Sequence, residues 1–268
     1  MKSDIFRIKA LPFTLKRRIN AAGVHFGLSL LLAAIAGVLV FAVWYPHPYW
    51  EISGGPKLFL LMTTVDVIMG PLMTFVVFNV AKRRVELFRD LTIIGFIQAA
   101  ALAYGLWIVA VVRPVHLVFE IDRFRVVHAI EVPAELLDQA LPDLQRLPLS
   151  GPTLLSIREF KDSNESFESI MAELRGSAIS FRPGMWQSYA KAKPQVVHRA
   201  KPLSELKKRF PARTDEINSA LASWWVTTEE KHGTSVGYIP MVGRVGFWTV
   251  FIDTKTADII SFVPIDSF

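Results

Sequence analysis

The chain has 268 residues, of which 51% are hydrophobic and none is cysteine, and its formal net charge is +6. A mean hydropathy of +0.35 is high for a soluble protein, and a chain without cysteine has no disulfides, thiol nucleophiles or thiolate metal sites. The excess positive charge does not indicate a nucleic-acid partner, because residues 1–112 hold 11 Lys and Arg against 5 Asp and Glu, whereas residues 113–268 hold 19 of each.

Three apolar stretches in the N-terminal part of the chain are each about 20 residues long and almost free of charge. They are Ala21–Val43, Leu58–Val80 and Leu91–Val112. A helix of about 20 residues crosses the roughly 30 Å of hydrocarbon in a bilayer, so the sequence predicts three transmembrane helices. The alternative is a set of helices buried in a large soluble core, but core helices of that length usually carry a polar stripe.

Lys and Arg distinguish the two sides of this predicted membrane domain. The first connection, WYPHPYWEISGGPK, has a single basic residue, Lys57. Basic residues gather instead at the N-terminus and in the second connection, as Lys2, Arg7, Lys9, Lys16, Arg17 and Arg18, then Lys82, Arg83, Arg84 and Arg89. Because cytoplasmic loops are rich in Lys and Arg, the sequence predicts a cytoplasmic segment 1–20 and a transmembrane domain 21–112. An odd number of spans then places a domain 113–268 in the periplasm, with the spans in a bacterial inner membrane.

Aromatic residues follow the first stretch. Trp44, Tyr45, Tyr49 and Trp50 fit an aromatic belt at the periplasmic interface of the membrane. The first stretch is too long for the apolar core of a secretory signal, and no small-residue cleavage site lies before the aromatic cluster. We therefore expect this span to remain attached.

The segment after the third stretch changes its periodicity from helical to alternating. RPVHLVFEIDRFRVVHAIEV predicts two strands joined at Asp122-Arg123, or one bent strand. Helices are then predicted over residues 133–147, 163–176, 202–210 and 212–226, and strands over 235–242, 245–253 and 258–265. Strands, helices and an antiparallel meander together predict an α+β domain.

A search for catalytic patterns finds little. The chain has no Walker, Rossmann or HExxH pattern, and its six His show no ligand spacing along one helix. His116 and His128 fall in the first predicted strands, where we interpret them as polar residues on an open sheet face. GYIPMVGRVG does not open a helix, so it predicts a turn between strands rather than a phosphate loop. The sequence predicts no catalytic residue, metal or cofactor.

Asp66 lies in the middle of the second apolar stretch, four residues before Gly70-Pro71. A charged carboxylate in hydrocarbon costs about 2.5 to 3.5 kcal/mol on insertion scales, so this group must be paired, protonated or hidden. Gly70-Pro71 should kink the span and free backbone carbonyls. Gln98 and Tyr104 of the third stretch are the expected hydrogen-bond donors to Asp66. Two roles remain open: a polar docking point or proton relay, or an internal bond that holds the helices together.

The segments VWYPHPYWEISGG, VDVIMGPLMTFVVF and LAYGLWIVAVVRPVHLVFEIDRFRVV follow one another between residues 43 and 127. In order and spacing they resemble the TfpX/TfpZ family of type IV pilin accessory proteins. The resemblance covers residues 24–130 most densely. The matching positions are Trp44, Tyr45, Pro46, Gly54, Gly55, Asp66, Gly70, Pro71, Tyr104, Gly105, Trp107, Arg113, Pro114, Asp122, Arg123 and Phe124.

The resemblance implies a non-enzymatic inner-membrane protein that assists or modulates pilus assembly, with type IV pilin and the lipid bilayer as partners. We expect the helical bundle to pack on the hydrophobic helix of pilin and the outer domain to contact its head. The expected contact positions are the carboxyl residue with its Gly-Pro pair and three small residues that allow close helix approach. They are Asp66, Gly70, Pro71, Gly95, Ala99 and Ala103.

Two other functions are alternatives to this one. The first is a membrane enzyme or transporter acting on envelope lipid or pilin-linked glycan, with Asp66 as proton carrier and Arg113 near a head group. Three spans make a small transport unit, however, and no second intramembrane carboxylate is present. The second is a periplasmic sensor, for which the basic cytoplasmic segments are too short to form an output domain.

Overall fold

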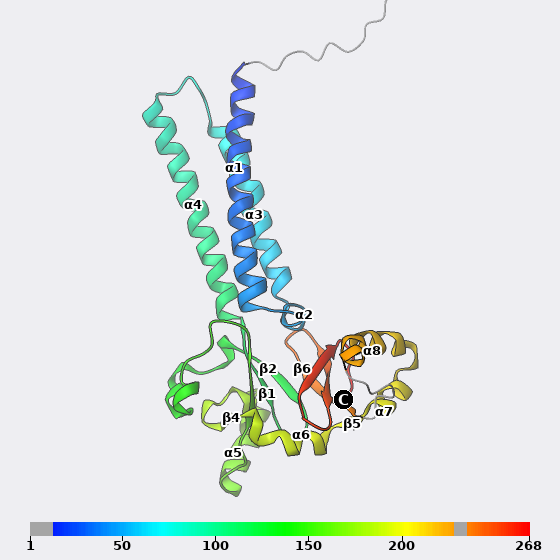
Figure 1. Cartoon of the computed structure of the whole chain (residues 1–268). Helices are drawn as coiled ribbons and strands as arrows, with labels where there is room; N and C mark the ends of the chain where they lie inside the picture. The colour runs from blue at the N-terminus through cyan, green and yellow to red at the C-terminus, as the bar shows by residue number, and fades with distance from the viewer. Residues whose placement is uncertain (1–12, 228–234) are drawn as a thin grey trace, which may run out of the picture. The chain divides into compact units, whose positions relative to one another are not determined.

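The computed structural model describes residues 13–227 and 235–268 (Figure 1). Lys2, Arg7 and Lys9 of the predicted cytoplasmic segment lie outside the described residues. The chain divides into two compact units. The helical unit contains residues 13–40 and Pro56–Val109, and the mixed unit contains Phe41–Gly55 and Ala110–Phe268.

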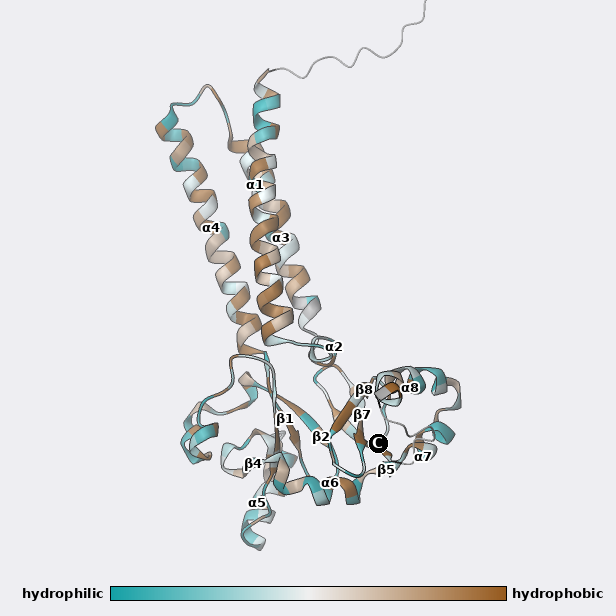
Figure 2. Ribbon diagram, viewed as in Figure 1, coloured by the Kyte–Doolittle hydropathy of each residue, from teal (hydrophilic) through white to brown (hydrophobic). Residues whose placement is uncertain are grey.

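The helical unit is built from three long helices, which confirms the predicted number. They are α1 (Phe13–Val38), α3 (Gly55–Val77) and α4 (Arg84–Val111). Each is long and apolar enough to cross a membrane (Figure 2). Few residues of each are buried inside the protein. The helices begin before the predicted stretches because the charged turns at their ends, such as Lys16–Arg18, are also helical.

Three local features lie within or beside these helices: a proline, a hydroxyl bonded to the backbone and a salt bridge. Helix α3 continues through Pro71, although proline removes a backbone donor. Thr63 Oγ1 donates to the carbonyl oxygen of Phe59 at 2.8 Å, a bond common for hydroxyls in apolar helices. Lys82 of the second connection forms a salt bridge of 2.8 Å with Asp90 of α4. This salt bridge joins the connection to the first turns of the helix.

The mixed unit is organised around one sheet whose order is β4-β3-β1-β2-β6-β7-β8, with β5 paired to β6. The strands are β1 (Pro114–Phe119), β2 (Phe124–His128), β3 (Thr153–Ile157), β4 (Trp186–Ser188), β5 (Lys201–Pro202), β6 (Val236–Val242), β7 (Phe247–Asp253) and β8 (Ile259–Val263). The predicted hairpin and C-terminal meander are confirmed as antiparallel pairs. Two further pairs, β1 with β3 and β2 with β6, are parallel, so the sheet is mixed.

Short α-helices complete the described part of the mixed unit. They are α2 (Tyr49–Ser53), α5 (Ser163–Leu174), α6 (Lys193–Arg199), α7 (Leu203–Arg209), α8 (Thr214–Ala220) and α9 (Ala222–Thr227). Single turns of 3₁₀ helix add η2 (Ala129–Glu131), η3 (Ala134–Gln139), η4 (Pro142–Leu144), η5 (Ile179–Phe181), η6 (Pro183–Met185), η7 (Tyr189–Ala192) and η8 (Pro211–Arg213), while η1 (Leu39–Trp44) is a π-helical extension of α1.

Two helix predictions need correction. Residues 133–147 form the 3₁₀ turns η3 and η4 and no α-helix, because Pro142 interrupts the segment and restricts the residue before it. Residues 212–226 form two helices, α8 and α9, and no single one. Helix α5 is as expected, and Asp162 caps it by accepting a hydrogen bond from Glu165 N at 2.8 Å.

The interpretation of His116 and His128 as residues on an open sheet face is wrong. Both side chains are buried, and all six residues of β1 are buried. One hydrophobic cluster includes Leu117, while another includes Val115 and Val118, so this part of the sheet is covered on both faces. A strand covered on both faces offers no solvated side for a polar residue.

The first connection also differs from the aromatic belt expected of it. Tyr45 is fully buried and Tyr49 packs against the main core of the mixed unit. Ile52, which is fully buried, belongs to that core. Tyr49 also meets Phe262 of β8 in an edge-on ring contact with centroids 5.8 Å apart. Of the four predicted belt residues, Tyr45 therefore lies in the interior of the mixed unit and Tyr49 is partly buried against its core.

Candidate functional site

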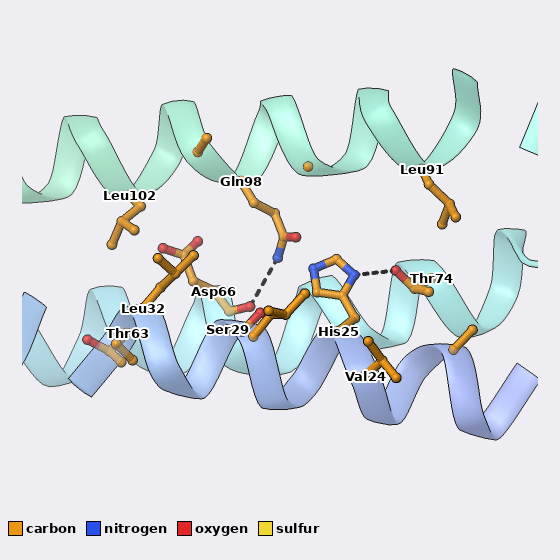
Figure 3. Close-up of a pocket in the computed structure, with 15 residues that line it drawn as sticks. Val24, His25, Ser29, Leu32, Thr63, Asp66, Thr74, Leu91, Gln98 and Leu102 are labelled. Carbon is orange, nitrogen blue, oxygen red and sulfur yellow. Dashed lines mark hydrogen bonds between the residues drawn. The ribbon is translucent and has the colours of Figure 1, made fainter. Parts of the chain in front are cut away.

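A pocket of about 510 Å³ lies between the three helices of the helical unit (Figure 3). We call it the groove. Its α1 side includes Leu28 and Leu32, its α3 side Asp66 and Thr74, and its α4 side Gly95 and Ala99. Most of its lining is apolar, with a few polar side chains among the carbon surfaces. Pockets of this kind, between helices of a bundle, are common binding sites.

Asp66 is brought to Gln98 as expected, but through a different atom. Gln98 Nε2 donates to the main-chain oxygen of Asp66 at 3.1 Å (Figure 3). The carboxyl oxygen Oδ2 is buried, and no described residue forms a hydrogen bond with it. Tyr104 lines a smaller pocket of about 280 Å³ together with Asp66, yet it is 63% exposed and forms its ring contact with Trp107.

Gly70 leaves room for the side chain of Gln98 between α3 and α4. A Cβ atom at this position would lie 1.8 Å from Gln98 Nε2, so any side chain would displace the amide. Gly105 is similar, because a Cβ there would lie 1.9 Å from Met62 Sδ. These two glycines of the motif allow close approach of the helices, as small residues do in membrane bundles.

The three predicted small-residue positions on α4 do not all face the groove. Gly95 and Ala99 line it, whereas Ala103 is exposed on the helix and lies outside the groove lining. A Cβ at Gly95 would meet no atom within 4 Å, so this position faces open space. Pro71 and Trp107 also lie outside the groove lining, and Trp107 is 60% exposed.

The contact between His25 and Thr74 was not predicted from the sequence. His25 Nδ1 lies 2.5 Å from Thr74 Oγ1, and this bond joins α1 to α3 at the groove (Figure 3). Thr74 is buried although the rest of its helix is mostly exposed. A histidine in an apolar stretch, 49 residues from a threonine, carries no local signal of its partner.

Motif residues of the first connection form contacts within the mixed unit. The ring of Tyr45 covers Gly55, where a Cβ would lie 2.9 Å from the ring carbons. Pro46 lies against Gly151, whose backbone N donates to Val43 O at 2.7 Å. Gly54 has φ of +71°, which favours glycine, and it ends helix α2. The Trp-Tyr-Pro and Gly-Gly motifs therefore bind residues 41–55 to this unit.

Arg113 and Pro114 occupy the beginning of β1. Arg113 donates from Nε and Nη2 to Pro148 O, at 3.3 and 3.2 Å, and from Nη1 to Ala110 O at 2.7 Å. One guanidinium thus joins the end of α4 to the segment before β3. Burial lowers the pKa of Arg113, partly offset by Tyr45.

The Asp-Arg-Phe motif forms the turn between β1 and β2. Arg123 Nε donates to Asp122 Oδ1 at 2.9 Å and lies over the ring of Phe268. Phe124 is fully buried, with its ring centroid 5.3 Å from that of Phe119. Nearby Glu120 is buried and accepts from Arg125 Nε at 2.8 Å. These contacts give the motif a structural role in the hairpin.

A polar chain inside the mixed unit joins the first connection to the sheet. Ser53 Oγ lies 2.9 Å from His128 Nε2, and His128 Nδ1 lies 3.0 Å from Glu131 Oε2. Burial would raise the pKa of Glu131, but hydrogen bonds from the ring and backbone N of His128 outweigh it and lower that pKa. The order of hydroxyl, imidazole and carboxylate is that of hydrolytic triads. Here Ser53 is only 8% exposed and His128 is fully buried, so the three groups are placed as a tie between elements.

The described residues contain no group of three or more His, Asp or Glu side chains arranged to hold a metal ion. The groove itself offers isolated polar atoms among carbon surfaces, an arrangement that suits an apolar guest with one polar group.

Comparison with known proteins gives a consistent family. A family model described as fimbrial assembly protein FimB matches residues 13–54. Fimbrial assembly proteins of serogroups I and E1 of Dichelobacter nodosus are 36% and 34% identical to this chain, in both cases over 92% of this chain and 95% of the relative. The protein of serogroups C1 and C2 from the same organism is 44% identical over 44% of this chain and 91% of its own length. No solved structure matches the chain.

The match to the family model covers α1, η1 and the first connection up to Gly54, the segment whose motif residues are tied into the mixed unit. The relatives of serogroups I and E1 extend the similarity over both units. This chain therefore belongs to the fimbrial assembly protein FimB family.

Proposed function

We propose that this protein is a membrane-embedded accessory protein of type IV pilus assembly, of the TfpX/TfpZ type, which binds pilin and acts without catalysis. Membership of a family of fimbrial assembly proteins supports a role in pilus biogenesis. The observation that carries the binding role is the groove, an apolar space between three membrane-length helices with an unpaired carboxyl group on its wall.

The division of the chain supports a contact in two parts. A pilin subunit awaiting assembly has an apolar helix in the bilayer and a folded head outside it. In our proposal the helical unit binds the former and the mixed unit contacts the latter, so that the subunit stays folded and extractable. The Asp66 region, with Gly70 and Pro71 on α3 and Gly95 and Ala99 on α4, supplies the membrane contact; the exposed Ala103 extends it along α4.

We place the protein in a bacterial inner membrane, with segment 1–20 in the cytoplasm, 21–112 as the transmembrane domain and 113–268 in the periplasm. The distribution of Lys and Arg supports this orientation, because the basic residues precede the first span and fill the second connection, whereas the first connection has one. Reporter fusions after residues 82 and 268 test it. Activity of a cytoplasmic reporter at the first position and of a periplasmic reporter at the second is the expected result.

Photo-crosslinking in the native host tests the client. A probe at Gly95 faces the groove, and a matched probe at the next residue, Phe96, which is 74% exposed and does not line the groove, serves as control. A third probe at Val226, which is 87% exposed, reports on the mixed unit. We expect pilin at Gly95 and Val226 and mainly lipid at Phe96.

Two outcomes would contradict the proposal. If removal of this chain leaves pilin abundance and piliation unchanged, the accessory role is wrong. If the Gly95 and Val226 probes recover only lipid or transporter subunits, the result favours the membrane enzyme or transporter acting on envelope lipid or pilin-linked glycan.

A further inference from the structure

The polar side chains around the groove are not equivalent. His25 and Thr74 are bonded to each other, Thr63 donates to its own helix, and Gln98 donates to the main-chain oxygen of Asp66. Among the buried side-chain nitrogen and oxygen atoms of the described helical unit, Oδ2 of Asp66 is the one without a hydrogen-bond partner. The bundle therefore bonds these four groove-lining side chains internally and leaves an acceptor at the carboxyl of Asp66.

The position of the carboxyl makes this acceptor available to a guest. Asp66 lines both the groove and the smaller pocket that contains Tyr104, so it lies at the junction of two spaces. In Figure 3 its side chain points into the space between α4 and the other two helices. Leu32 and Leu102 lie beside it, and both are flexible apolar side chains that a guest can displace.

The α4 side of the groove allows a helix backbone to come close. Gly95 and Ala99 are one turn apart on α4, both line the groove, and the space in front of Gly95 is unfilled. Small residues at this spacing permit helix contact in membranes, where dispersion and hydrogen bonds replace the hydrophobic effect. A carboxyl group in hydrocarbon is costly without a hydrogen-bond partner, so it favours a guest that supplies one donor.

We propose that the groove receives one transmembrane helix of the client, and that this helix donates a hydrogen bond from a hydroxyl, amide or ammonium group to the carboxyl of Asp66. The inference rests on the proposed function for the identity of the client as a pilus subunit. Complementarity selects the guest, because a lipid acyl chain fills apolar space but has no donor for the carboxyl.

The test uses the full chain in its native membrane, with a photo-crosslinking probe at Leu28 on the α1 side of the groove. Asp66→Leu removes the acceptor and Asp66→Asn keeps one acceptor oxygen. Gly95→Leu fills the space in the groove, and Gly27→Leu is the matched control, because Gly27 also has no atom within 4 Å but does not line the groove. Capture is normalised to the amount of folded chain, measured by fluorescence-detected size exclusion.

We expect at least a tenfold loss of pilus-subunit capture in Asp66→Leu and Gly95→Leu, a smaller loss in Asp66→Asn, and no change in Gly27→Leu. Unchanged capture in Asp66→Leu would overturn the donor contact. Capture of lipid alone, or of a second copy of this chain, would overturn the choice of guest even where piliation still depends on the chain. Failure of the proposed function is a separate result, because in that case deletion of the chain leaves piliation unchanged.

Discussion

The hydroxyl of Ser53 lies 2.9 Å from Nε2 of His128, although the two residues are 75 positions apart and lie on opposite sides of two membrane-length helices in the sequence. This bond joins the first connection to β2, and Glu131 holds the other ring nitrogen. The contact shows that the first connection is an integral part of the mixed unit.

Ser53→Ala should lower the free energy of unfolding of the mixed unit by about 1 to 3 kcal/mol, because it leaves a buried imidazole nitrogen without its partner. Urea unfolding of the purified chain in detergent, followed by near-UV circular dichroism, measures the change. Ser177→Ala, at an exposed loop position, is the control. Equal stability of the two variants would show that the bond makes no net contribution.

Ile52→Ala tests the same unit through its core. Ile52 is fully buried among residues of the sheet, so the truncation should cost about 2 to 5 kcal/mol. Glu51→Ala on the same short helix removes only an exposed side chain and should have little effect. The measurement is again urea unfolding of the full chain. A loss confined to the membrane helices would contradict the assignment of residues 41–55 to the mixed unit.

Alanine at three glycines should separate close helix contacts from open positions. Gly70→Ala displaces Gln98 from its bond to Asp66, at a cost of about 1 to 2 kcal/mol. Gly105→Ala should cost less, since Met62 is flexible, and Gly95→Ala should be neutral because it faces empty space. Thermal denaturation in bicelles provides the ranking. A variant at Gly95 that destabilises as much as Gly70→Ala would contradict the open groove.

The mixed unit should lose stability in mild acid through His116. Burial lowers the pKa of His116 to about 4, below the value of about 6.5 in an unfolded chain. The unfolded state therefore binds the proton first, and the free energy of unfolding should fall by about 3 kcal/mol as pH falls from about 6.5 to about 4.

His116→Gln is the comparison for this titration. In the native chain, Thr153 Oγ1 lies 2.6 Å from His116 Nδ1. The amide of the variant keeps a hydrogen-bonding group near this hydroxyl and does not titrate. The difference between the two pH profiles of unfolding isolates His116 from other groups that titrate in this range. Parallel profiles would show that the imidazole is not held neutral.

The sequence was most informative where one local signal was enough. The length and apolarity of the three spans predicted α1, α3 and α4, and alternation predicted β1, β2 and the C-terminal meander. Strand β3 and its parallel pairing with β1 were not predicted. The strand has five residues between a Gly-Pro pair and a polar segment, and so short a stretch carries little periodic pattern. The 3₁₀ turns of 133–147 share a helix-like apolar spacing, and only their prolines distinguish them.

The same limit applies to the groove. Asp66 stood out by itself, since a carboxyl in an apolar stretch is costly wherever it lies. Its relation to Gln98 was expected, but the atom that accepts the bond depends on how α3 and α4 approach at Gly70. His25 and Thr74 gave no signal, because each is an ordinary residue until the two helices meet.

The sequence by itself determined the class of each segment: which stretches are apolar enough to cross a membrane and which alternate as strands do. These follow from composition and periodicity, which are local properties. Only the tertiary structure decided which side chains share a space. It buried Tyr45, which the sequence had placed at the membrane interface, bonded Ser53 to His128, and left Oδ2 of Asp66 without a hydrogen-bond partner, because these outcomes depend on packing between residues distant in the chain.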